Sequence, residues 1–139
     1  MTDYSGNCHC GAIGFTYSTQ IIPPEWSVRA CQCSFCLAHD ALSTSDPTGE
    51  LCFSTSDPEK LQRYQFGLKT ADFLLCRECG VYIGAIIETG NGLWGIINTH
   101  ALTDLPADMT ADTPVDYDGE ISGIRVSRRE ERWTPATLK

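Results

Sequence analysis

The chain has 139 residues and a formal net charge of −8, from 18 acidic and 10 basic residues. This length predicts a single domain, residues 1–139, with a real hydrophobic core. From the sequence we expect no lysine or arginine cluster that would attract phosphates, and this acidic balance argues against a nucleic-acid partner. No apolar run approaches the roughly 20 residues that span a membrane, and the first residues lack the features of a signal peptide. We therefore expect a soluble, cytoplasmic protein.

The N-terminal part predicts two strands and a short helix. Ile13 to Tyr17 alternate with small polar residues, as in a half-buried strand. The two prolines after Ile22 predict a loop, and a second strand over residues 26–31 leads into a group of three cysteines. A short helix is then expected up to Leu42, with Ser34 as its N-cap. Because a helix N-terminus stabilises thiolates, this placement suits the cysteines.

The middle of the chain predicts a series of short antiparallel strands separated by polar turns. An Asn-Gly pair at residues 91–92 is typical of a hairpin turn. Beyond His100 the chain is rich in aspartate, threonine and proline, and we expect an extended wrap anchored by Trp133. Strands or apolar pieces are predicted over residues 51–53, 61–66, 73–76, 81–87 and 93–98.

Seven of the eight cysteines occur in metal-binding spacings. In a reducing cytosol such cysteines are more often metal ligands than disulfides. Zinc uses four thiolates in closed structural sites, and three protein ligands plus an exchangeable one in catalytic sites. We therefore expect two zinc ions. The three groups are Cys8-His9-Cys10-Gly11, Cys31-Gln32-Cys33-Ser34-Phe35-Cys36 and Cys76-Arg77-Glu78-Cys79-Gly80.

The first and last groups resemble each other because a glycine follows the second cysteine of each. Glycine adopts the positive φ that a tight metal-binding turn needs. We expect Cys8, Cys10, Cys76 and Cys79 to form a closed, structural zinc site that ties the first strand to the central strands.

The middle group, Cys31, Cys33 and Cys36, cannot complete a tetrahedron alone. Its fourth ligand is open between water, an external thiol, His39 and Cys52. Binding by His39, three residues after Cys36, would make a closed structural site, whereas Cys52 reads more simply as a small buried residue.

The order CxCG, CxCxxC and CxxCG, followed by a strand pair and a C-terminal tryptophan, resembles the glutathione-dependent formaldehyde-activating enzyme family, also grouped with centromere protein V-like proteins. The resemblance extends over nearly the whole chain. It implies a mainly β, Mss4-like fold of antiparallel sheets pinned by a zinc site. It also implies that the outer four cysteines hold structural zinc and that the middle three hold a second zinc, which meets the thiol of glutathione.

The leading hypothesis is a zinc-dependent carbon–sulfur lyase that acts on glutathione, or another thiol, and formaldehyde or a related aldehyde. The open zinc at the middle cysteines would lower the pKa of the thiol, and His39 or Asp40 would move the proton. Arg29 and Arg77 would either hold a carboxylate of glutathione or screen the sulfur charge. The alternatives are a non-catalytic zinc module that binds a protein partner, and a redox sensor in which oxidation ejects zinc.

Overall fold

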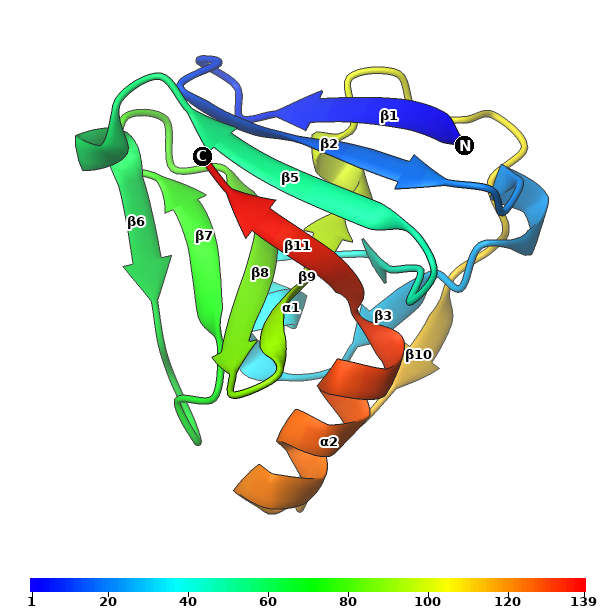
Figure 1. The fold of residues 1–139 in the computed structure, drawn as a ribbon, viewed down its shortest axis with the longest axis vertical. Helices are drawn as coiled ribbons and strands as arrows, with labels where there is room; N and C mark the ends of the chain where they lie inside the picture. The colour runs from blue at the N-terminus through cyan, green and yellow to red at the C-terminus, as the bar shows by residue number, and fades with distance from the viewer.

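The computed structural model describes all residues, 1–139, and shows the predicted mainly β fold (Figure 1). Two α-helices are present, α1 (Ser34–His39) and α2 (Ser122–Arg132), with 3-10 turns at Pro23–Glu25, Pro58–Lys60 and Thr99–Ala101. The strands are β1 (Thr2–Asn7), β2 (Ile13–Thr19), β3 (Arg29–Cys31), β4 (Ser43–Thr44), β5 (Glu50–Thr55), β6 (Leu61–Tyr64), β7 (Asp72–Cys76), β8 (Tyr82–Thr89), β9 (Gly92–Asn98), β10 (Thr113–Val115) and β11 (Thr134–Leu138).

The strands form two antiparallel groups that the C-terminal strand joins. One group runs β1-β2-β5 and the other β6-β7-β8-β9. Strand β11 pairs parallel to β5 and antiparallel to β9, so it lies between the two groups (Figure 1). Beyond β9 the sheet continues through β4 and β3 to β10. The last 30 residues therefore complete the sheet, because β11 joins its two groups and β10 forms its final strand.

The predicted meander of β7, β8 and β9 is confirmed, since each strand pairs antiparallel with the next. The expected strand over residues 26–31 is shorter, Arg29–Cys31, and β1 was not predicted. Two pairings, β11 with β5 and β10 with β3, are parallel, in contrast to the purely antiparallel sheets expected.

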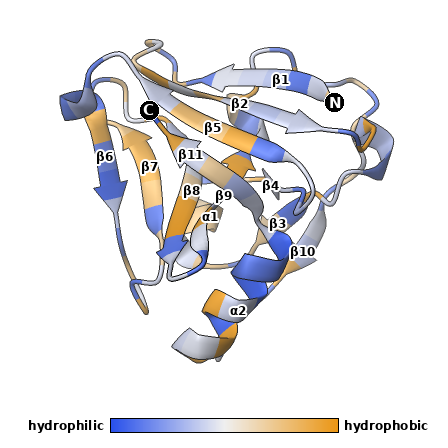
Figure 2. Ribbon diagram, viewed as in Figure 1, coloured by the Kyte–Doolittle hydropathy of each residue, from blue (hydrophilic) through white to orange (hydrophobic).

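The prediction of an extended C-terminal wrap fits residues 103–121, where β10 is the only regular element, but it was wrong for the residues after them, which form α2 and β11. Helix α2 has only two apolar side chains, Ile124 and Val126, among its eleven residues, which leaves no continuous apolar stripe for sequence analysis to detect. Its C-terminal turns are strongly hydrophilic (Figure 2). The role of Trp133 as an anchor is confirmed: it caps α2 and is 4% exposed.

The interior divides into two apolar clusters. The larger one packs β2 and β5 against β8 and includes Cys8 and Cys76. The smaller one contains Phe73, Tyr82 and Trp133 and reaches Cys36. Strands β7 and β8, which contribute to both, are largely apolar (Figure 2). Each group of cysteines is thus fixed at the edge of a packed core.

Neither helix is a candidate for crossing a membrane, since α2, the longer of the two, has 11 residues.

Candidate metal centres and the adjoining cavity

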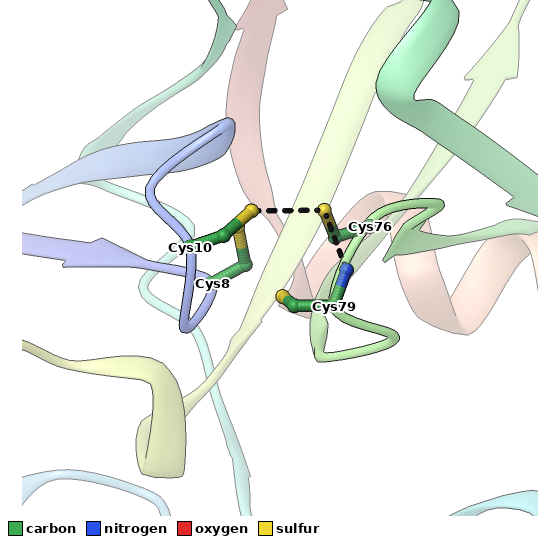
Figure 3. A group of neighbouring side chains, drawn as sticks. All are labelled: Cys8, Cys10, Cys76 and Cys79. Atoms are coloured by element: carbon green, nitrogen blue, oxygen red, sulfur yellow. Dashed lines mark hydrogen bonds between the residues drawn. The ribbon is translucent and has the colours of Figure 1, made fainter.

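The structure brings Cys8, Cys10, Cys76 and Cys79 together from two loops far apart in the sequence. All four Sγ atoms lie within 4.8 Å of one another. One loop joins β1 to β2 and the other joins β7 to β8, and the two face each other (Figure 3). Cys8 and Cys76 are buried, whereas Cys10 is exposed and Cys79 is half-buried.

The two loops have the same local construction. The N–H of Cys8 donates to the carbonyl of Ile13 (3.0 Å), and that of Cys76 donates to the carbonyl of Val81 (3.1 Å). The glycine that follows each cysteine pair has a positive φ, +84° at Gly11 and +80° at position 80. A side chain there would strain the backbone, so glycine is required for both turns.

The sulfur spacing of this four-cysteine cluster fits zinc. A tetrahedral zinc with Zn–S bonds of about 2.3 Å places its sulfur atoms about 3.8 Å apart. The Sγ of Cys10 lies 3.7 Å from that of Cys8 and 3.5 Å from that of Cys76. Backbone N–H groups also point at the sulfurs, from Ile13 to Cys8 (3.4 Å) and from Glu78 to Cys76 (3.3 Å). Such hydrogen bonds stabilise thiolate ligands and fix their orientation.

Cys31, Cys33 and Cys36 form a second cluster, whose Sγ atoms also lie within 4.8 Å of one another. The cluster lies at the start of α1, but the N-cap is Cys33 and not Ser34 as expected: its sulfur accepts a hydrogen bond from the N–H of Cys36 (3.4 Å). The local reason is that Cys33 has the extended backbone of an N-cap, so its own side chain reaches the first turn.

The hydrogen bonds within this cluster shift the pKa values of its thiols in opposite directions. Hydrogen bonds from Cys31 and Cys36, together with those from backbone N–H groups, lower the pKa of Cys33 to about 2. Hydrogen bonds to Cys31 and Cys33 raise the pKa of Cys36. A cluster that already stabilises one thiolate without metal is a suitable donor set for a soft, thiophilic cation such as zinc.

The other expected ligands do not join this cluster. His39 is exposed on α1 and its ring packs on Phe35, with 4.4 Å between ring centroids. Neither His39 nor Cys52, which lies half-buried in β5, belongs to either sulfur cluster. Arg77 is exposed in the loop of the four-cysteine cluster. The three-cysteine cluster therefore contains no fourth histidine, cysteine or carboxylate ligand.

A cavity of about 440 Å³ adjoins the three-cysteine cluster, a volume in the range of small-molecule sites. All three cysteines line it, whereas none of the outer four does. Its apolar wall consists of Phe66, Phe73, Ile96, Val115 and Trp133, and its polar wall of residues 116–118 and several arginines.

The arginines of this cavity were missed by sequence analysis, apart from Arg29. Arg125, Arg128 and Arg129 of α2 all line it, so a basic cluster does exist in the C-terminal region. Glu120 receives hydrogen bonds from the first two, at 3.1 Å from Arg125 Nε and 2.9 Å from Arg128 Nε. The signal that could have revealed the cluster is four arginines within eight residues, 125–132.

Arg129 differs from its neighbours because it is 9% exposed and belongs to no ion pair of the structure. Its Nη1 donates to Thr70 Oγ1 (2.8 Å), and its guanidinium lies over the ring of Trp133, 4.8 Å from the centroid. Burial, with the nearby charges of Arg128 and Arg125, lowers its pKa to about 10. It therefore stays positively charged at neutral pH.

Comparison with known proteins shows the family to which the chain belongs. A crystal structure of a Rhodobacter sphaeroides protein is similar in fold, with a TM-score of 0.58 and 26% sequence identity, over 78% of this chain and 99% of that protein. No curated protein sequence matches the chain. The family model described as glutathione-dependent formaldehyde-activating enzyme matches residues 3–113, which include both cysteine clusters. The chain therefore belongs to the glutathione-dependent formaldehyde-activating enzyme family.

Proposed function

We propose that this protein is a zinc-dependent enzyme that joins a thiol, glutathione or a close analogue, to formaldehyde or a related aldehyde and cleaves the same adduct, as a carbon–sulfur lyase. The observation that carries the proposal is the position of the three-cysteine cluster: it lines a cavity of small-molecule size and has no fourth protein ligand. Membership of the family supports glutathione and formaldehyde as the substrate classes.

The two clusters would have different roles. Cys8, Cys10, Cys76 and Cys79 offer a closed set of four sulfurs, which suits structural zinc. Zinc held by Cys31, Cys33 and Cys36 would lower the pKa of a thiol in the remaining position, so that the thiolate is available at neutral pH.

In the proposed reaction the thiolate sulfur attacks the aldehyde carbon and a carbon–sulfur bond forms. The carbonyl π electrons move to oxygen, which takes a proton from water, while the proton lost by the thiol goes to solvent. The apolar wall at Phe73, Ile96 and Trp133 would limit the water around the reacting sulfur. We do not assign the proton transfer to His39, because its ring packs on Phe35 and does not line the cavity.

The test combines zinc content with adduct formation. Purified, reduced wild-type protein is expected to hold two zinc ions and to accelerate formation of the S-hydroxymethyl adduct from glutathione and ¹³C-formaldehyde, followed by NMR exchange measurements. Cys33→Ser is expected to lose one zinc and the acceleration. Cys52→Ser is the matched control, since Cys52 belongs to neither cluster and should leave both readouts unchanged.

The result that contradicts the proposal is a wild-type protein with two zinc ions and no effect on the adduct reaction. In that case the non-catalytic zinc module becomes the better interpretation. If the second zinc instead leaves on mild oxidation and a disulfide forms among the three cysteines, the redox-sensor alternative is favoured.

A further inference from the structure

Arg129 is a buried cation in the cavity wall without an anionic partner. Its Nε is buried and has no hydrogen-bond partner, and its one hydrogen bond, from Nη1, goes to the neutral hydroxyl of Thr70. Leaving a charged donor buried and unpaired is costly, so such groups in native structures call for an explanation. The buried Nε leaves no room for a ligand atom, whereas Nη2 is neither buried nor hydrogen-bonded, so an anion that binds from the Nη2 side of the guanidinium is a direct one.

The neighbouring arginines of α2 differ from Arg129, because their guanidinium groups are paired with a carboxylate of the protein itself. Arg125 and Arg128 both bind the carboxylate of Glu120, and Arg128 also stacks on Tyr117, 3.5 Å from the ring centroid. Two carboxylates of the cavity wall, Asp116 and Asp118, are exposed, and neither forms an ion pair with Arg129. Among the three arginines of α2 that line the cavity, Arg129 is therefore the one without an anion. Arg29, elsewhere in the wall, also forms no ion pair, but it is less buried and its Nη2 donates to Ser45 Oγ (2.7 Å).

The surroundings hold the guanidinium in a defined orientation. The ring of Trp133 supports one face, at 4.8 Å from centroid to Cζ, and Thr70 fixes Nη1. Cation–π contact and a side-chain hydrogen bond together reduce the entropy lost when a planar anion binds. A carboxylate is the anion that matches the planar fork of a guanidinium.

We propose that Arg129 binds a carboxylate of the thiol substrate, so that the cavity selects thiols that carry negative charge over neutral ones. This inference rests on the proposed function, because the thiol itself is expected at Cys31, Cys33 and Cys36, on the same cavity. Helix α2 lies outside the residues that match the family, 3–113, so this selection is a property of the chain's own C-terminal region.

The experiment compares glutathione with its diethyl ester, which keeps the thiol and lacks both carboxylates, by calorimetric titration of the zinc-loaded protein. A charge-assisted pair predicts that wild type prefers glutathione by about 10- to 100-fold. Arg129→Gln is expected to lose this preference while its affinity for the ester stays unchanged. The ester is also larger than glutathione, but this difference is the same for every variant. A change in the preference between wild type and Arg129→Gln therefore reports the charge alone.

Arg132→Gln is the matched control, since Arg132 is on the same helix, is exposed and does not line the cavity. It should keep the wild-type preference. Arg129→Lys keeps the charge and loses the planar fork, so its preference for glutathione should lie between those of wild type and Arg129→Gln. This variant tests the inference if Arg129→Gln does not fold. Zinc content and circular dichroism report whether each variant is folded.

Two outcomes overturn this inference and leave the proposed function standing. The first is a preference for glutathione as large as that of wild type in folded Arg129→Gln or in Arg129→Lys. The second is an equal loss of affinity for glutathione and for the ester in folded Arg129→Gln. A wild-type protein that binds neither thiol refutes the proposed function as well. The two failures are therefore distinguishable.

Discussion

Zinc bound by the four-cysteine cluster should stabilise the fold more than zinc bound by the three-cysteine cluster, because it cross-links residues that are much farther apart in the sequence. Cys10 and Cys76 are 66 residues apart in sequence, and cross-linking a loop of that length removes about 4 kcal/mol of chain entropy from the unfolded state. The three-cysteine cluster lies within six residues, for which the same relation gives about 2 kcal/mol. Typical domains are stable by about 5–15 kcal/mol, so a loss of 4 is readily measured.

The variants that test this difference are two double substitutions. Cys10→Ser with Cys79→Ser removes the two less buried members of the four-cysteine cluster and leaves Cys8 and Cys76 in the core. Cys31→Ser with Cys33→Ser removes two thiols, both half-buried, from the other cluster. Urea unfolding should show the first variant to be less stable by about 2 kcal/mol, or roughly 6 °C in Tm. Equal losses, or the reverse order, would refute the assignment of the structural role.

Three further predictions follow from single side chains. His39→Ala should retain both zinc ions and the adduct activity, because this exposed ring lies outside the cavity; loss of turnover with zinc retained would show that it carries a proton. Tyr82→Phe should leave thermal stability unchanged or raise it, since the buried hydroxyl has no hydrogen-bond partner, and a clear fall in Tm would contradict that. The hydrogen bond from Arg128, helped by Arg125, lowers the pKa of Glu120 in the folded state, so its stabilising effect is present above its unfolded pKa and is lost as pH falls through the folded one. The stability difference between wild type and Glu120→Gln should therefore shrink in acid, and a difference that stays constant down to pH 2 would refute this.

Much of the arrangement of the cysteines could be predicted from local sequence. Two closely spaced cysteines followed by glycine specify a turn by short-range geometry alone, and Gly11 adopts the positive φ that this requires. The strands β7, β8 and β9 were predicted for the same reason, because alternation and an Asn-Gly turn are local features. The division of the cysteines into four and three also followed from their spacing and from the flanking glycines.

The cavity could not be predicted, because long-range packing assembles it. Helix α2 has no continuous apolar stripe, and long-range contacts hold it in place: the buried Trp133, the hydrogen bond from Arg129 to Thr70 (2.8 Å) and the one from Ser45 Oγ to the carbonyl of Arg132 (2.7 Å). Only when β11 inserts between β5 and β9 does α2 come to face residues 31–36, about ninety positions earlier. Local spacing thus determined which residues can hold metal, whereas tertiary structure alone decided that an unpaired arginine from the C-terminal region lies beside the open cluster. The physical reason is that cysteine and glycine act through neighbours in sequence, while a cavity depends on contacts that span the whole chain.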